Sequence, residues 1–395
     1  MKSVKRVFRD ETGVVAITVA VAILVIFGFA VLAVDMSLIQ LAKVQLQNAA
    51  DAAALAGAVA LAASAGDQSV ATAEAIRIAG LNVAVQDMQR PVVITGSDVA
   101  FPGPDTITVT THRTIGTNDP VTLYFLKVLG PENKGEVTAR ATATVSCISG
   151  TDCLRPFCPP DRWEDADNDS VWDPEEAFVD TNGNLAWDPG ETFTDDNGNG
   201  VWDPAEFYDP LLTGYRAPDD IGIEVTLKLR NSNKLPLMGW YYAVRFGALN
   251  TGDPICEGGD CYREWIHLCE PYLVSIGDWL QLEKGVMEGP TDQGLEELIT
   301  MDPTAEWDAA TGTVINSAFP TSPRVIKVPA FDPTLGKQDD LGGPGYVTVT
   351  KFMVLFIEQH YGGDVVGRFM KTATAGVPDP GCSSGGFLYT VYLVE

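Results

Sequence analysis

The hydrophobic pattern of the chain begins with an apolar run that is long enough to cross a membrane. Residues 14–34 contain no charge, and only Thr18 is mildly polar. As a helix, this run would span the hydrocarbon core of a bilayer, about 30 Å. Basic residues precede the run and Asp35 follows it, so the positive-inside rule places the N-terminus in the cytoplasm. A cleaved signal peptide is the alternative, but helix-favouring residues continue well past any cleavage point.

The helical pattern continues beyond the apolar run. Between Met36 and Ala62 polar residues recur at helical spacing on one face, and residues 48–63 are dense in alanine, which suits tight packing. A second helix is predicted over residues 69–88. Alternating apolar segments predict strands over residues 92–94, 106–111 and 139–146. Together these patterns predict one long helix with a small sheet packed near its exit from the membrane, as in pilins.

The C-terminal half is rich in short segments that predict strands. These segments alternate or run apolar between Gly and Pro turns, and they cover residues 221–229, 240–246, 324–329, 347–357 and 387–393. Residues 295–300 carry the one clear helical pattern of this half. We therefore expect a β-sandwich or a barrel-like domain of about 180 residues.

Between these regions one twelve-residue pattern occurs three times, with starts 15 residues apart. Each copy has oxygen-bearing side chains at positions 1, 3, 5, 9 and 12, which is the order found in a twelve-residue calcium loop. Position 7 would contribute its backbone carbonyl, and the glutamate at position 12 both its oxygens. The predicted ligands are Asp165, Asp167, Asp169, Val171, Asp173 and Glu176; Asp180, Asn182, Asn184, Ala186, Asp188 and Glu191; and Asp195, Asn197, Asn199, Val201, Asp203 and Glu206.

Position 6 of such a loop is usually glycine, and here it reads Ser170, Leu185 and Gly200. The third loop therefore fits the pattern best and the second fits it least. A solvated acidic linker is the alternative, but each copy carries a Trp-Asp-Pro core, and disordered segments are poor in aromatic residues. Three residues between loops are too few for the paired helices of a calcium sensor. We expect about three calcium ions in a rigid spacer.

The charge and the cysteines of the chain narrow its environment. The net charge is −27, and residues 161–209 hold sixteen carboxylates and a single arginine. Such a surface repels nucleic acid, so no nucleic-acid partner is expected. The seven cysteines all lie at or beyond Cys147, and disulfides in an oxidising compartment are favoured over zinc or free thiols. The odd count leaves one thiol that is free or bonded between chains.

Recognisable catalytic motifs are missing from the sequence. The three histidines form no HExxH motif, and there is neither a GxSxG motif nor a phosphate-binding glycine loop. His267 is interpreted as a strand histidine beside a disulfide at Cys269, and the Ser-Ser-Gly-Gly segment at 383–386 as a turn. We therefore expect that the protein is not an enzyme.

Several segments of the N-terminal third carry a family resemblance. Arg9-Asp-Glu-Thr-Gly13, the apolar run, Leu32-Ala-Val-Asp35 and the segment 46–58, which reads Leu-Gln-Asn-Ala-Ala-Asp-Ala-Ala-Ala-Leu-Ala-Gly-Ala, resemble the TadE/TadG-like family of Tad (Flp) pilus-assembly proteins. Residues 121–145 resemble the end of that module, so the resemblance covers residues 1–150. Residues 285–326 are similar, more weakly, to the C-terminal region of some larger members. The resemblance implies no catalytic residue.

Taken together, the sequence predicts an α+β protein in four parts. These parts are a hydrophobic pilin-like helix (1–64), an α/β module (65–150), the calcium tract (161–209) and a β-rich extracytoplasmic domain (214–395). The expected function is that of a structural, calcium-stabilised component of a Tad-type pilus or filament at the cell surface. Its partners would be the membrane and either other copies of itself or pilus-assembly subunits, and both a filament subunit and a membrane-held tether fit. The alternative is a surface adhesin or ligand-binding module displayed on a calcium-rigidified stalk.

Overall fold

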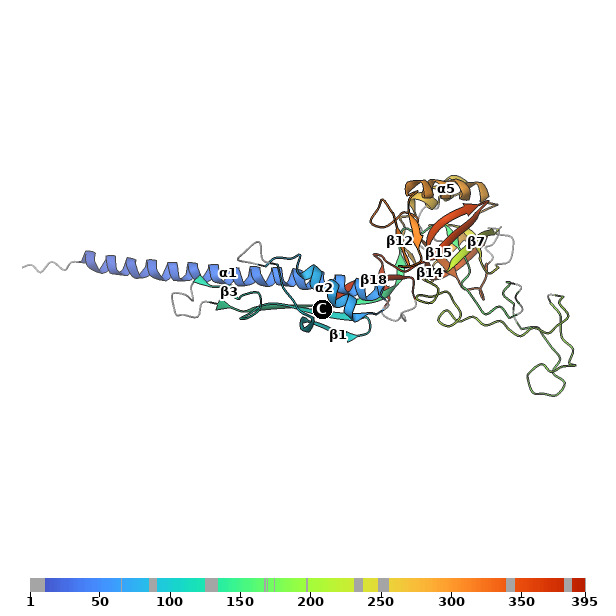
Figure 1. Ribbon diagram of the computed structural model, residues 1–395, viewed down its shortest axis with the longest axis horizontal. Helices are drawn as coiled ribbons and strands as arrows, with labels where there is room; N and C mark the ends of the chain where they lie inside the picture. Colours follow the sequence, from blue (N-terminus) through green and yellow to red (C-terminus); the bar gives the residue numbers. More distant parts are fainter. Residues whose placement is uncertain are drawn as a thin grey trace, which may run out of the picture. The chain divides into compact units, whose positions relative to one another are not determined.

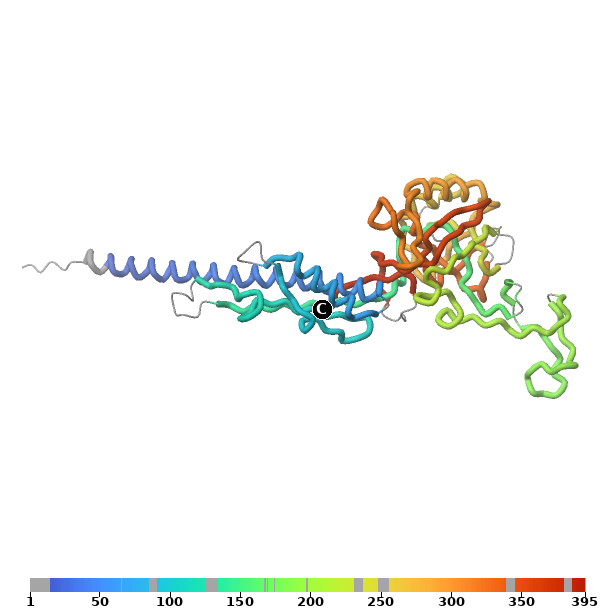
Figure 2. The backbone as a smooth tube through the Cα atoms, in the orientation of Figure 1, coloured from blue at the N-terminus to red at the C-terminus, as the bar shows by residue number. Residues whose placement is uncertain are grey.

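The computed structural model describes residues 11–64, 66–84, 91–124, 134–166, 168, 170–173, 175–196, 198–230, 237–247, 256–338, 345–379 and 386–394. The chain forms two compact units (Figure 2). The first contains residues 1–145 and 391–395, and the second contains residues 146–390. Strands β5 (Val137–Thr151) and β18 (Leu388–Val394) contribute residues to both units.

The first unit is built on the helix α1 (Glu11–Ala63), which confirms the predicted long N-terminal helix (Figure 1). Its first half exposes large apolar side chains, among them Ile17, Leu24 and Phe29, each about two-thirds exposed or more. The most apolar stretch of 18 residues has no buried residue and a mean hydropathy of 3.0. By length and composition, this is the one helix among the described residues that is able to cross a membrane.

The second half of α1 packs against the helix α2 (Gln68–Ala79) and the sheet of strands β1 (Val99–Gly103), β2 (Thr106–Arg113) and β5. Small side chains make this close packing possible. The buried face of α1 consists of Ala42, Leu46, Ala49, Ala50, Ala53, Ala54, Ala58 and Leu61. At Gly57 an added Cβ atom would lie 2.5 Å from Ile107 Cδ1 and 3.3 Å from the Ala71 carbonyl oxygen, so this position requires glycine.

Polar contacts hold the rest of the unit to α1. The Asp35 carboxylate is buried at the end of the apolar run and accepts a hydrogen bond from the Tyr124 backbone N–H at 2.6 Å. Tyr124 follows the short strand β3 (Val121–Thr122), which pairs with β4 (Lys134–Gly135). The buried Thr111 hydroxyl of β2 donates to the Leu46 carbonyl at 2.9 Å. The folded module therefore contacts the helix directly after the apolar run ends.

In the second unit the strands pair in a closed ring. Strand β10 (Trp279–Leu282) pairs with β14 (Tyr346–Tyr361), β14 with β15 (Asp364–Phe369), β15 with β7 (Glu224–Arg230), β7 with β8 (Trp240–Arg245), and β8 again with β10. Strands β6 (Phe157–Cys158) and β13 (Val325–Phe331) extend this barrel-like sheet. Its core contains Tyr241, Phe246, Val354 and Phe369.

The remaining elements of this unit are two helices and several short strands. The helices are α4 (Gly259–Leu268) and α5 (Glu288–Met301), which contact each other. The short strands are β9 (Val274–Ser275), β11 (Glu306–Asp308), β12 (Thr313–Ile315), β16 (Thr372–Ala373) and β17 (Val377–Asp379). A 3-10 turn, η1 (Gly96–Asp98), precedes β1 in the first unit.

The predicted α+β class and most of the predicted elements are confirmed, and three predictions are wrong. Residues 92–94 are not a strand, and β1 follows them instead. Helix α2 ends at Ala79, earlier than predicted, because the chain turns at Gly80; residues 85–90 lie outside the described residues. Helix α4 was not predicted, so His267 lies on a helix and not on a strand.

The cysteines form disulfides in the second unit, as expected. Cys153 is bonded to Cys269, and Cys256 to Cys261; Cys147 is also disulfide-bonded. Cys158 is the free thiol among the described cysteines, and it is fully buried in the core. Burial raises the pKa of the Cys158 thiol well above its usual range, so this cysteine is an inert core residue.

We predict that Gly57→Leu destabilises the first unit by about 1–3 kcal/mol, because the side chain overpacks the contact with Ile107. The gain in helix propensity, about 1 kcal/mol, does not compensate for that overpacking. Thermal unfolding monitored by circular dichroism would measure the change. Ala63→Leu, at the exposed last residue of the same helix, is the matched control and should change stability by less than about 0.5 kcal/mol.

Candidate metal centre

The three repeats form an antiparallel excursion from the second unit (Figure 2). Residues 164–178 run outward and residues 193–207 return beside them, with the second repeat at the far end. Isolated bridges join Glu164 to Phe207 and Phe178 to Phe193. The Val179 N–H donates to the Thr192 carbonyl at 2.9 Å, and the Thr194 N–H donates to the Ala177 carbonyl at 2.8 Å. The first and third repeats are therefore neighbours in space.

The described residues of the three loops share two backbone features. Positions 4 and 6 have positive φ in every copy, at Asn168, Ser170, Gly183, Leu185, Gly198 and Gly200. In each loop the position-1 aspartate accepts a hydrogen bond from the position-6 N–H, at 3.0 Å for Asp165, 2.8 Å for Asp180 and 2.9 Å for Asp195. This hydrogen bond folds the first six positions of each loop around the position-1 carboxylate.

The second loop is closed by its own glutamate. Glu191 accepts hydrogen bonds from the Thr181 N–H at 2.7 Å and from the Asp188 N–H at 3.0 Å, which are positions 2 and 9 of the loop. The side-chain amides of Asn182 and Asn184 donate to the Asp188 carboxylate at 2.5 and 2.8 Å. Four predicted ligand residues of this loop thus already face one another.

The first and third loops exchange their closing glutamates. Glu206 of the third repeat accepts from the N–H groups of Ala166 and Asp173, at 3.2 and 3.1 Å, which are positions 2 and 9 of the first loop. Glu176 of the first repeat accepts from Asp196 and Asp203, at 2.8 and 3.1 Å, which are the same positions of the third loop. The sequence suggested that each glutamate would close its own loop, and the structure differs because the two repeats lie side by side.

Both exchanged glutamates are buried. Glu176 is 4% exposed and Glu206 is 8% exposed. Burial raises the pKa of Glu206 to about 7, and the nearby carboxylates of Asp165 and Asp173 also raise it. One oxygen of Asp165 is buried without a hydrogen-bond partner among the described residues. The centre of the first loop therefore favours a bound proton or a cation.

Aromatic side chains join the loops. The indole rings of Trp187 and Trp202, both at position 8, are stacked with centroids 5.2 Å apart. Phe178 packs edge-on against Trp202, and Phe193 packs edge-on against Trp187. The Trp202 indole N–H also donates to the Glu176 carbonyl at 3.0 Å. The tract thus has a small aromatic core in place of a long apolar segment.

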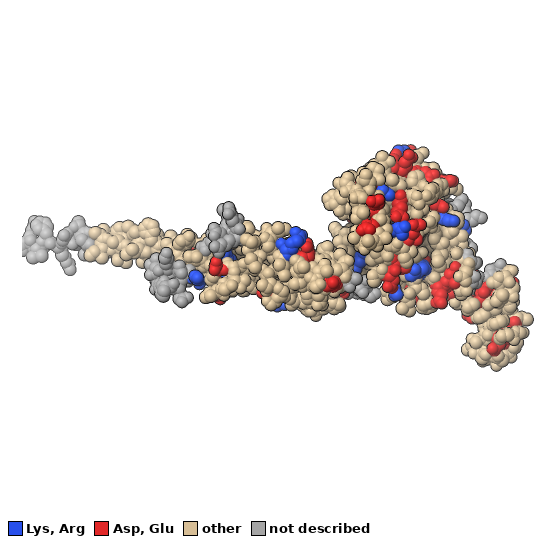
Figure 3. All heavy atoms as spheres, viewed as in Figure 1, with Lys and Arg blue, Asp and Glu red and all other residues tan. Residues whose placement is uncertain are grey.

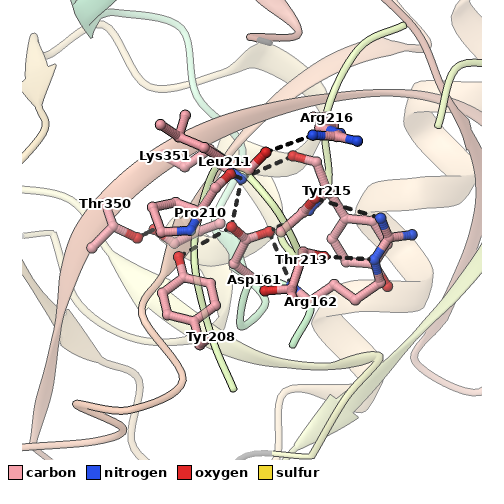
Figure 4. Close-up of polar contacts among 12 residues, drawn as sticks. Asp161, Arg162, Tyr208, Pro210, Leu211, Thr213, Tyr215, Arg216, Thr350 and Lys351 are labelled. Carbon is pink, nitrogen blue, oxygen red and sulfur yellow. Dashed lines mark hydrogen bonds and ion pairs between the residues drawn. The ribbon is translucent and has the colours of Figure 1, made fainter. Parts of the chain in front are cut away.

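A buried aspartate holds the two ends of the tract together (Figure 4). Asp161 is fully buried and accepts hydrogen bonds from the N–H groups of Arg162 and Tyr215, the Tyr208 hydroxyl and the Lys351 ammonium. Lys351, on β14, also donates to the Tyr215 carbonyl at 2.8 Å. A Cβ atom at Gly214 would overlap both charged groups. Sequence patterns did not reveal this cluster, which we call the Asp161 clamp, because Asp161 and Lys351 lie 190 residues apart.

Some of the predicted metal ligands lie outside the described residues, and others lie close together in the structure. Asp167, Asp169 and Asn197 lie outside the described residues. The structure brings Asp165 and Asp173 together with Glu206, and Asp203 together with Glu176. Within the described part of the chain, no three His, Cys, Asp or Glu side chains are grouped so that they could hold a metal ion. Calcium binding by these residues stays a prediction.

The histidines show no metal grouping in the described part of the chain. His267 lies 3.1 Å from the Arg263 carbonyl and 3.2 Å from Glu297, on the helix pair α4 and α5. Its neighbour Cys269 is held in a disulfide.

Figure 3 shows acidic side chains on the visible face of both the barrel and the tract.

Comparison with known proteins gives one match. Residues 13–64 match the family model Tad, described as putative Flp pilus-assembly TadE/G-like. This match covers almost all of α1 and stops where the helix ends. No curated protein and no solved structure matches the chain.

We predict that Lys351→Met destabilises the second unit by about 3 kcal/mol, because it leaves Asp161 buried without its cation. Chemical denaturation at constant calcium would measure the loss. Lys284→Met, at an exposed lysine, is the control and should change little. A loss below about 1 kcal/mol would show that the clamp is not stabilising.

The loss of stability caused by Lys351→Met should depend on pH. Burial raises the pKa of Asp161 above its usual value, and removal of Lys351 raises it further. The folded state then binds a proton more tightly than the unfolded state does, so the deficit of the variant shrinks as pH falls toward 4. Denaturation series at pH 7 and pH 4.5 would test this.

We predict that Leu185→Gly stabilises the second loop by about 1 kcal/mol, because Leu185 has a φ of 58° and its side chain is 88% exposed. Hydrogen exchange across residues 180–191 should slow by about fivefold without calcium. Gly200→Ala, at the same position of the third loop, is the reciprocal variant and should have the opposite effect on residues 195–206.

Proposed function

We propose that this chain is a membrane-anchored structural component of a Tad-type pilus system, and that its extracytoplasmic part carries a calcium-stabilised protrusion. The sequence suggested a spacer between domains, but both ends of the tract meet at the Asp161 clamp on the second unit. The family match lies on α1, the element that would hold the protein in the membrane. The apolar half of that helix makes no buried contact with the rest of the protein, so hydrocarbon or helices of other subunits would cover it. The basic residues before the apolar run orient the N-terminus toward the cytoplasm.

The alanine-rich half of α1 supports a structural role for the first unit. Its buried face is already covered by α2 and by the strands β2 and β5, so it forms the core of a folded module. The partners of such an anchored module are other copies of this chain or subunits that assemble the pilus. The exposed apolar half of α1 is the surface through which they would meet within the membrane.

One observation carries the calcium proposal: three loops of the same twelve-residue pattern share the same two backbone features, and each is closed by a glutamate carboxylate between positions 2 and 9. Calcium binds six to eight oxygen atoms at flexible angles, and these loops offer carboxylate, amide and carbonyl oxygens. The side-chain amides of Asn182 and Asn184 would rotate to present oxygen to the ion in place of their present N–H contacts with Asp188.

Calcium would also offset the electrostatic cost of the tract. Sixteen carboxylates lie within residues 161–209, and charges closer than the screening length of about 8 Å at physiological ionic strength repel one another. Hydrogen bonds from backbone N–H groups compensate only part of this repulsion. About three bound ions would neutralise six charges and hold the outgoing and returning segments of the tract in one conformation.

We predict that calcium protects residues 161–209 of the full-length protein, in detergent, from limited proteolysis. Affinity in the weak extracellular range is expected, on the order of 10⁻⁴ to 10⁻³ M. At free calcium near 100 times the dissociation constant, each independent site gains about 2.7 kcal/mol. Cleavage should be mapped by mass spectrometry in calcium, in magnesium at equal ionic strength, and in chelator.

The barrel should resist the protease under all three conditions, because its core does not depend on the tract. Magnesium is the matched control for ionic strength, since it demands a more rigid octahedral site. If residues 161–209 are cut at the same rate in calcium and in chelator, the metal is not structural and the calcium part of the proposal fails.

A further inference from the structure

The hydrogen bonds of the position-12 glutamates link the first and third loops in a reciprocal manner. Each of the two carboxylates accepts from positions 2 and 9 of the other loop, with all four distances between 2.8 and 3.2 Å. The same two positions of the second loop are bonded by its own Glu191. The exchanged carboxylates therefore occupy the place in the partner loop that Glu191 occupies in its own.

The backbone around the two glutamates has the same reciprocity. The Glu176 N–H donates to the Asp203 carbonyl at 3.2 Å, and the Glu206 N–H donates to the Asp173 carbonyl at 3.3 Å. Each glutamate is thus paired through its backbone with position 9 of the other loop, and its side chain turns back onto that same loop. Both side chains are more than nine-tenths buried by this arrangement.

We propose that the first and third loops form one composite calcium unit, in which Glu206 closes the first site and Glu176 closes the third, while the second loop binds calcium on its own. This inference rests on the proposed calcium function. The first site would combine Asp165 and Asp173 with Glu206, and the third would combine Asp195 and Asp203 with Glu176.

Coupling between the two sites follows from the shared parts. An ion in the first loop orders Glu206, and the backbone pair at Glu206 and Asp173 is tied to the pair at Glu176 and Asp203 through the same short antiparallel segments. Binding of one ion therefore pre-orders the closing residue of the other site, which is positive cooperativity. The second loop contributes neither of these hydrogen bonds and contacts the third through the stacked Trp187 and Trp202, so an ion in the first or third loop does not pre-order its closing glutamate.

The exchange also makes the tract a closed structure. With the exchange, an ion in either site joins residues about thirty positions apart in the chain. Self-closed loops would leave the outgoing and returning segments joined only by contacts that involve no metal, such as the bridge between Glu164 and Phe207 and the packing of Phe178 on Trp202. The composite unit instead ties the outgoing and returning segments to each other at two points.

The test is calcium-dependent hydrogen exchange of the full-length protein in detergent, read in peptides that cover residues 165–173, 180–188 and 195–203. Glu206→Gln should abolish most of the calcium-induced protection of residues 165–173, at least tenfold at saturating calcium, and affect residues 195–203 less. Glu176→Gln should show the reverse pattern. Glu191→Gln is the matched control, and its loss should be confined to residues 180–188.

Calcium titration calorimetry of the same proteins gives the second readout. The parent should bind two ions with a Hill coefficient between 1 and 2 and a third ion independently. The control Glu191→Gln should keep the cooperative pair and lose the third ion. Glu206→Asp, which keeps the charge on a shorter side chain, should weaken the first site with the same localisation, so that the proposal can be tested if the glutamine variant does not fold.

Two different results would overturn the inference, and they can be told apart. If calcium protects the parent but Glu206→Gln affects residues 195–203 most strongly, each glutamate closes its own loop. The reciprocal closure by Glu176 and Glu206 is then wrong, although calcium binding is confirmed. If calcium leaves hydrogen exchange unchanged in all three segments of the parent, the proposed calcium function is wrong, and so is the composite unit.

Discussion

Burying a carboxylate costs several kcal/mol unless the protein provides hydrogen bonds or an opposite charge. Much of this structure depends on how that cost is met. Asp35 receives the Tyr124 N–H at the point where the apolar half of α1 ends. Asp161 receives four donors, including Lys351, and so joins both ends of the tract to the barrel. The donors to each of these buried carboxylates come from segments that are distant in the chain. Asp35 therefore holds α1 to the rest of the first unit, and Asp161 holds the tract to the barrel.

The desolvation cost of burying Glu176 and Glu206 is compensated only in part. Each has two backbone donors, and the described ion pairs include neither residue. The barrel can tolerate a costly buried pair such as Arg245 and Glu283 because the burial of its large apolar core offsets that cost. The tract has only its stacked indoles and phenylalanines for this purpose. The calcium ions proposed above would compensate the remaining cost in the tract, whereas the barrel has a large apolar core to stabilise it.

The sequence predicted what depends on local pattern. The long apolar run and the alanine periodicity predicted α1, and the alternation of apolar residues predicted β2, β5, β7, β8, β13 and β14. The twelve-residue spacing located the loops, but that spacing does not encode which loop a glutamate reaches. The exchange at Glu176 and Glu206 depends on the return of the chain after the second repeat. Helix α4 escaped prediction because it is short, amphipathic and begins within a disulfide loop at Cys261.

The two halves of α1 meet two different solvents, and the boundary between them is sharp. Most large apolar side chains up to Val34 are exposed, and Asp35 is already buried against the module; Met36, Leu41 and Val44 are exposed on the other face of the helix. A membrane that covers the apolar half must therefore end close to Asp35, because a hydrogen-bonded carboxylate and a strand are stable only outside the hydrocarbon region. No linker separates the apolar half of α1 from the first folded unit. Any displacement of that half reaches this unit through one continuous helix, which suits the structural role proposed above.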